Sequence, residues 1–116
     1  VMFFDCFHDM AVATAAARNA HKLLKPGGLV MLIEPLGPEE DTVEAAMALP
    51  TTALFSCFSC HFCTPCGMCD GGDALGITVA TAVHRRLFVD RAGFRSLESV
   101  PSPLNGMGFR LLLAKK

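Results

Sequence analysis

One junction in the sequence constrains the fold more than any other feature. An alanine-rich stretch, AVATAAARNAHKLL (11–24), predicts a helix, because alanine and straight-chain residues are the strongest helix formers. The helix must end at KPGG (25–28), where proline cannot continue it and glycine accepts a positive φ. The run LVMLI (29–33) follows at once. Because it is continuously apolar rather than alternating, it predicts a strand buried on both faces, as in a parallel sheet.

The first residues complete this unit. VMFF (1–4) is apolar and predicts the end of a second strand, so residues 1–34 are expected to form a strand, a helix and a parallel strand. Two further strands are predicted at 94–100 and 107–116. The turn-forming sequence PSPLNG separates them, which predicts a closing antiparallel hairpin.

Helical segments are predicted between these two sheet-forming regions, at 43–49 and at 78–93, the second ending at Gly93. The chain is therefore assigned to the α/β class. We divide it into three parts within one domain of residues 1–116: a strand–helix–strand unit (1–36), a lid or substrate segment (37–77), and a helix with the terminal hairpin (78–116).

Composition limits the partners of the chain. The formal net charge of its 116 residues is −1, which gives no electrostatic case for binding nucleic acid or an anionic membrane. No apolar run approaches the ~18 residues of a membrane span. The hydrophobic share of 52% is high for so small a domain, and an apolar run begins at Val1, so we expect the chain to be part of a longer protein. With no secretion signal, we expect a cytoplasmic location and reduced thiols.

Titratable residues follow both strands of the first unit. His8 and Asp9 come after residues 1–4, and Glu34 ends the second strand. Because parallel strands end at the same edge of a sheet, where ligands bind, these residues are expected to lie together. A histidine between two carboxylates suits proton abstraction near neutral pH. The alternatives are structural: Asp9 as a helix N-cap, His8 as a hydrogen-bonded loop residue, and Glu34 as a solvated strand end.

The most conspicuous motif is a cysteine ladder, in which cysteines occupy every third position of CFSCHFCTPCGMCD: Cys57, Cys60, Cys63, Cys66 and Cys69. Iron–sulfur loops begin with this spacing but continue differently, and structural zinc sites usually need two separated pairs. In a helix, steps of three residues turn the side chain by ~300°, so the thiols would fan around the axis. We interpret the ladder as packing or pocket lining, with no metal. A zinc or iron–sulfur binding module without catalysis is the alternative function.

Several of these segments together resemble a known family. A strand ending in FFDCFHDM, a helix closing with HKLLKPGG and the strand LVMLIEP are similar to the second half of class I S-adenosylmethionine-dependent methyltransferases. The finer match is to a subfamily that often carries an N-terminal winged-helix domain. Its later motifs correspond here to Ser59, Cys63 and Pro65, then ALG (74–76) and AGF (92–94).

The resemblance implies a function and a set of site residues. The fold would be a partial Rossmann-like sheet with its last strand inserted antiparallel, and the reaction methyl transfer from S-adenosylmethionine (SAM) to a small-molecule acceptor. His8 would be the catalytic base. The resemblance implies cofactor contacts at Phe3, Phe4 and Asp5, and an acceptor lined by Asp9, Glu34 and Cys63. The glycine-rich cofactor loop is missing from these residues, so we expect this fragment alone to be inactive. The sequence leaves the oligomeric state open, and a homo-oligomer is one of the alternatives.

Overall fold

Four strands form one mixed sheet in the order β1-β2-β4-β3. The strands are β1 (Met2–Phe4), β2 (Leu29–Pro35), β3 (Ser96–Val100) and β4 (Phe109–Lys115). The computed structural model describes residues 1–69 and 71–116. Strand β1 runs parallel to β2, and β4 lies antiparallel between β2 and β3. The predicted strand–helix–strand unit and the closing hairpin are both confirmed, as is the antiparallel insertion of the last strand.

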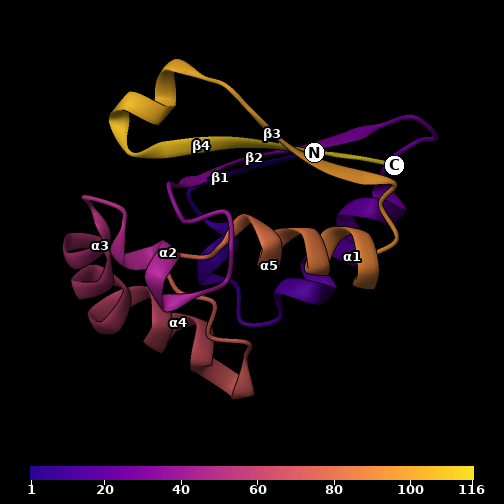
Figure 1. Cartoon of the computed structure of the whole chain (residues 1–116). Helices are drawn as coiled ribbons and strands as arrows, with labels where there is room; N and C mark the ends of the chain where they lie inside the picture. Colours follow the sequence, from indigo (N-terminus) through magenta and orange to yellow (C-terminus); the bar gives the residue numbers. More distant parts are fainter.

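The helices all lie on one side of the sheet (Figure 1). Two of them cover the sheet directly: α1 (Ala13–Leu23), and α5 (Thr81–Arg85), which continues as the π-helical segment η4 (Arg86–Arg91). The others form a separate helical lobe at one end of the molecule: α2 (Val43–Met47), α3 (Thr52–Phe58), the π-helical η2 (Ser59–Cys63) and α4 (Thr64–Met68). The described residues also form 3₁₀ turns: η1 (Phe7–Asp9), η3 (Cys69–Gly71) and η5 (Pro103–Met107). None of the described helices is both long and apolar enough to cross a bilayer.

Helix α1 begins later than the sequence predicts. Its N-cap is Val12, and no side chain caps it. Asp9 is therefore not the N-cap, because the chain first makes the η1 turn and a second turn before the helix starts at Ala13. The C-terminal end matches the prediction, with Gly27 at φ 75°. Lys116 reinforces this end by donating from Nζ to two carbonyls at the end of the helix, those of His21 and Leu24, each at 2.7 Å.

The core lies between the helices and the sheet. The side chains of Phe7, Leu32, Phe88 and Leu112 are fully buried there, and the rings of Phe7 and Phe88 stand 5.1 Å apart. Small alanines on the buried side of α1, such as Ala17, let that helix pack closely against η4. These contacts fix the position of η1, which carries Phe7 into the core.

The opposite face of the sheet is apolar but only partly covered. Registered rows of side chains run across β1, β2 and β4 on this face: Met2 beside Met31 and Leu113, and Phe4 beside Ile33 and Leu111. Met2 is 60% exposed and Phe4 54% exposed. The expectation that 29–33 is buried on both faces is therefore wrong for the described residues, because the helices that cover the sheet, α1 and α5, lie on its other face.

Candidate functional site

Glu34 joins the ends of the two parallel strands. It lies near the carboxyl end of β2, is 1% exposed, and directs its carboxylate toward the η1 turn that follows β1. Oε1 accepts hydrogen bonds from the backbone N–H groups of Cys6 at 3.2 Å and Phe7 at 2.9 Å. Oε2 accepts from the N–H of His8 at 3.3 Å. The buried Glu34 carboxylate thus provides hydrogen-bond acceptors for three backbone N–H groups that lie beyond the end of β1.

His8 is held by the same carboxylate. Its Nδ1 lies 2.6 Å from Oε2 of Glu34, and the residue is 2% exposed. Because an ionised carboxylate only accepts hydrogen bonds, Nδ1 carries the proton and the lone pair of the neutral ring sits on Nε2. Nε2 lies 3.4 Å from Oδ1 of Asp9. The expected position of His8 between two carboxylates is therefore observed.

The protonation of this pair follows from burial and from its partners. Burial by itself lowers the pKa of His8, but the hydrogen bond to Glu34 and the charges of Glu34 and Asp9 outweigh it, so the pKa is raised. Burial by itself raises the pKa of Glu34, but the hydrogen bonds from His8 and from the amides of Phe7 and Cys6 lower it overall. Glu34 stays ionised and stabilises a proton on the imidazole.

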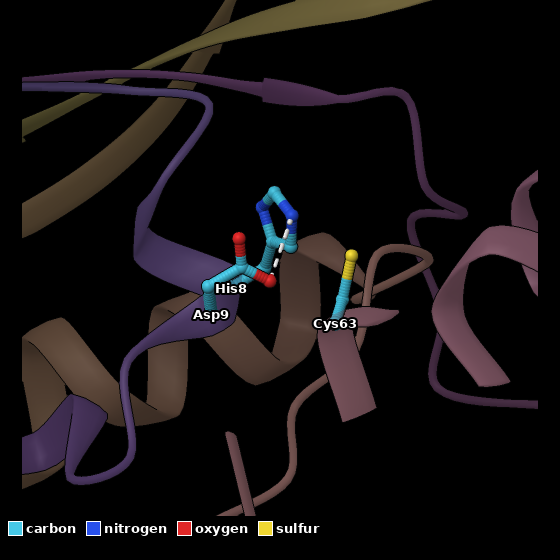
Figure 2. Close-up of side chains that lie close together, drawn as sticks. All are labelled: His8, Asp9 and Cys63. Carbon is cyan, nitrogen blue, oxygen red and sulfur yellow. Dashed lines mark ion pairs between the residues drawn. The ribbon is translucent and has the colours of Figure 1, made fainter. Parts of the chain in front are cut away.

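Cys63 reaches the site from the helical lobe. It is the last residue of η2, and Figure 2 shows its thiol near the ring of His8 and the carboxylate of Asp9. The Sγ atom, a ring nitrogen of His8 and a carboxylate oxygen of Asp9 all lie within 4.8 Å of one another. Burial, together with the carboxylate of Asp9, raises the pKa of Cys63 to about 11. Within the described residues, Oδ1 of Asp9 is buried and makes no hydrogen bond.

The predicted cofactor residues lie beside this cluster at the end of β1. Phe3 is half-buried, with its ring 5.3 Å from the ring of Phe7. Phe4 and Asp5 are exposed. Asp5 adopts φ 48° and donates its backbone N–H to the carbonyl of Ile33 at 2.7 Å. The structure therefore brings His8, Asp9 and Cys63 together, with Glu34 at the other ring nitrogen of His8, and leaves Phe4 and Asp5 exposed at the end of β1. Their roles stay predictions.

Of the five ladder cysteines, only Cys63 lies in the cluster that it forms with His8 and Asp9. The segment from α3 through η2 to α4 is helical throughout, so the thiols point in different directions. Cys63 is half-buried, and the other four ladder cysteines are exposed: Cys57, Cys60, Cys66 and Cys69. Within residues 1–69 and 71–116, the only group of three metal-ligand side chains close together is His8, Asp9 and Cys63.

Two glycines set the position of the helical lobe. Gly76 adopts φ 71°, and a Cβ there would overlap Oγ of Ser59. That hydroxyl accepts the backbone N–H of Ile77 at 3.0 Å, which ties the 74–77 turn to η2. Gly72 packs so closely that a Cβ would overlap the carbonyls of Gly67 and Ala11. Both contacts hold the lobe, and with it Cys63, against the strand ends.

A buried arginine next to the site was missed by the sequence analysis. Arg110 on β4 pairs in register with Glu34 on β2 and is fully enclosed. Its Nη1 donates to Oγ1 of Thr81 at 2.8 Å, and its Nη2 donates to the carbonyl of Val79 and lies 3.3 Å from Nδ1 of His84. Burial lowers the pKa of Arg110 to about 10. Burial, and then the charge of Arg110, lower the pKa of His84 to about 4.

The alternation of side chains along β4 could have shown that Arg110 is buried. In GFRLLLA it has the same parity as the buried Leu112 and Ala114, so it must point toward the helices. The guanidinium clamps the loop after β2 to the start of α5, since Nη1 also approaches the carbonyls of Gly37 at 3.4 Å and Pro38 at 3.5 Å. Arg110 therefore supports the site indirectly, by holding the backbone of this loop in position. A shallow hollow near α5, lined by residues such as Leu75, Val83 and Arg86, includes none of the predicted site residues.

Comparisons with known proteins bear on the fold. No protein-family model and no curated protein matches the sequence. Solved structures do match. A candidate O-methyltransferase from Nostoc punctiforme superposes with a TM-score of 0.67 at 18% identity, over 100% of this chain and 31% of that one. Human N-acetylserotonin methyltransferase, solved in complex with SAM, gives a TM-score of 0.61 at 21% identity, over 99% of this chain and 28% of that one.

A third structure agrees with these two. An O-methyltransferase family protein from Burkholderia thailandensis superposes with a TM-score of 0.62 at 22% identity, over 100% of this chain and 29% of that one. The chain therefore spans less than a third of the length of each of these structures. The resemblance drawn from the sequence is confirmed at the level of the fold: these residues adopt the fold of part of the three methyltransferase structures.

Proposed function

We propose that this chain carries the acceptor-side residues of an enzyme that transfers a methyl group from SAM to a hydroxyl group of a small molecule, with His8 as the general base. The observation that carries the proposal is the 2.6 Å contact between Nδ1 of His8 and Oε2 of Glu34. It fixes the proton on Nδ1 and leaves Nε2 free as a proton acceptor. The pair lies at the carboxyl ends of two parallel strands, where ligands bind in open α/β sheets.

The chemistry asked of these residues is limited. When bound, SAM supplies a methyl group whose bond to the positive sulfur breaks, with the electron pair left on sulfur, as the acceptor oxygen attacks. The protein must align the acceptor and remove its proton. Nε2 of His8 accepts that proton, and the resulting imidazolium is stabilised by the buried Glu34 carboxylate. Asp9 and Cys63 lie next to this ring, and we infer that they contact the acceptor.

The residues at the end of β1 fit one side of a SAM site. Phe4 offers an exposed apolar ring and Asp5 an exposed carboxylate beside the His8 cluster. Phe3 supports them from the core through its contact with Phe7. Because the chain spans less than a third of the methyltransferase structures it matches, we place the rest of the cofactor surface outside these residues and expect the fragment alone to be inactive.

The test uses the intact protein, with labelled SAM and a panel of phenols and catechols. Replacing the base in His8→Gln should lower kcat/KM by about 10²–10⁴-fold, the usual contribution of general base catalysis, with little change in SAM affinity. The matched control is His61→Gln, because His61 is an exposed histidine of the helical lobe and lies outside the cluster of His8, Asp9 and Cys63. Wild-type turnover in His8→Gln, or an equal loss of turnover and SAM affinity, would overturn the role of His8.

A further inference from the structure

The cluster of His8, Asp9 and Cys63 has the composition of a metal site. It combines an imidazole nitrogen, a carboxylate oxygen and a thiol sulfur, the three ligand types that zinc takes in proteins. The ligand atoms come from two separate elements, η1 and η2, and meet within 4.8 Å of one another. Figure 2 shows the three side chains converging. Among the described residues, the buried Oδ1 of Asp9 has no hydrogen bond that would explain its burial.

The spacing suits a tetrahedral ion. Zinc binds nitrogen and oxygen ligands at about 2.0–2.1 Å and sulfur at about 2.3 Å, which places neighbouring ligand atoms of a tetrahedron about 3.3–3.6 Å apart. Nε2 of His8 and Oδ1 of Asp9 are already 3.4 Å apart. The Sγ atom of Cys63 lies within 4.8 Å of the other ligands, so a small side-chain movement completes the set.

Glu34 supplies the support that a metal-bound histidine usually has. In most metal sites, the ring nitrogen that does not bind the ion donates to a carboxylate, which fixes the ring and raises its basicity. Here Nδ1 of His8 lies 2.6 Å from Oε2 of Glu34. The carboxylate is itself held by the amides of Cys6, Phe7 and His8. The lone pair of Nε2 is therefore oriented before any ion arrives.

The charge of the site also favours a cation. The ring of His8 lies between two carboxylates, with Nδ1 2.6 Å from Oε2 of Glu34 and Nε2 3.4 Å from Oδ1 of Asp9. These two carboxylates concentrate negative charge around the ligand atoms. A divalent cation offsets that charge and displaces the thiol proton, as metals do at cysteine ligands.

We propose that Nε2 of His8, the carboxylate of Asp9 and the thiolate of Cys63 bind one Zn²⁺ ion, with the fourth position open to solvent. Binding releases the thiol proton to solvent and involves no change of oxidation state. The ion takes the lone pair that the general base needs, so a metal-bound site cannot accept a proton at Nε2. Only this last consequence rests on the proposed function, and the binding itself does not.

The test is a titration of the intact, chelator-treated protein with Co²⁺, which replaces zinc and reports its ligands by absorbance. We expect one equivalent to bind, with tetrahedral cobalt bands and a thiolate-to-cobalt band, and Zn²⁺ to displace it. The isosteric Asp9→Asn and the substitution Cys63→Ser should each weaken binding, and Cys63→Ser should also remove the thiolate band. Glu34→Gln, which replaces none of the three ligand residues, should weaken binding by about 10–100-fold.

Exposed thiols of the ladder could take up metal themselves, so a matched variant separates the two sites. Combined replacement of Cys57, Cys60, Cys66 and Cys69 by serine leaves His8, Asp9 and Cys63 untouched and changes only exposed positions. This variant should still bind one equivalent with the full thiolate band. Loss of the band in it would assign metal binding to the ladder and overturn the proposal. So would an unchanged affinity in Asp9→Asn, or no cobalt bands in the wild-type protein.

Discussion

Replacing Glu34 by glutamine is the most informative single change at the site. The two side chains have the same shape, but the amide offers one acceptor oxygen where the carboxylate offers two. If the amide oxygen keeps the amides of Cys6 and Phe7, the new NH₂ group faces the backbone N–H and the Nδ1 of His8. The NH₂ group and the backbone N–H of His8 are then two hydrogen-bond donors that face each other. The imidazole must carry its proton on Nε2, so that Nδ1 can accept a hydrogen bond from the NH₂ group.

The size of the effect follows from these bonds. Hydrogen bonds to charged groups contribute about 1.5–3 kcal/mol each. The variant loses the 3.3 Å bond to the His8 amide outright and keeps the Nδ1 contact only in the other tautomer. We expect the free energy of unfolding to fall by about 2–3 kcal/mol. We expect kcat/KM to fall by at least about 10²-fold, because Nε2 then carries the proton and cannot act as a base.

The assay combines urea unfolding of the intact protein, methyl transfer from labelled SAM, and nitrogen NMR of the His8 ring. The NMR signal of Nε2 should change from that of an unprotonated to that of a protonated ring nitrogen, which a merely structural defect would not produce. Glu98→Gln is the control, because it removes a carboxylate from an exposed pair with Lys115. Turnover near the wild-type value in Glu34→Gln, with His8→Gln inactive, would refute the claim that Glu34 sets the tautomer.

Three further outcomes are expected in the intact protein. Gly76→Ala should destabilise it by about 1–3 kcal/mol more than Gly27→Ala, measured by urea unfolding, because both have positive φ but only Gly76 would press a Cβ onto Ser59. Stability should fall as pH drops from about 6.5 toward 4, by up to about 1.4 kcal/mol per unit, since the unfolded state protonates His84 first; His84→Gln should flatten this slope. Arg110→Met should lower the melting temperature, because it leaves buried carbonyls without donors. Equal losses in the two glycine variants, an unchanged acid slope or an unchanged melting temperature would contradict the respective prediction.

Much of the architecture could be predicted because local chemistry and sheet geometry agree. The KPGG stop and the apolar run at 29–33 determine where α1 ends and β2 begins. Once two strands are parallel, their carboxyl ends must share an edge, and this brings His8 and Glu34 together. Burial of the strand on both faces could not be judged from these residues alone, because it depends on whether a second layer of helices covers the outer face.

The finer features of the site depend on packing that no local pattern encodes. A ladder repeating every three residues gives no reason to choose Cys63 over its neighbours, and the choice is made by how η2 packs against the strand ends. The reach of Glu34 to three amides depends on the positive φ of Asp5, which turns the chain back over the strand end. Arg110 gave only a parity signal, and its partners come from loops distant in sequence.

One lone pair links the two roles that we propose for the site. Glu34 orients Nε2 of His8 whether the atom receives a proton or a metal ion, so it contributes to both. Cys63 contributes differently: a base needs no thiol beside it, whereas an ion held only by His8 and Asp9 would have two protein ligands, fewer than zinc sites use. In this proposal, the imidazole binds a metal ion only if the Cys63 thiol lies beside it. The helical lobe carries Cys63, so the packing of that lobe around Gly72 and Gly76 sets the position of the thiol.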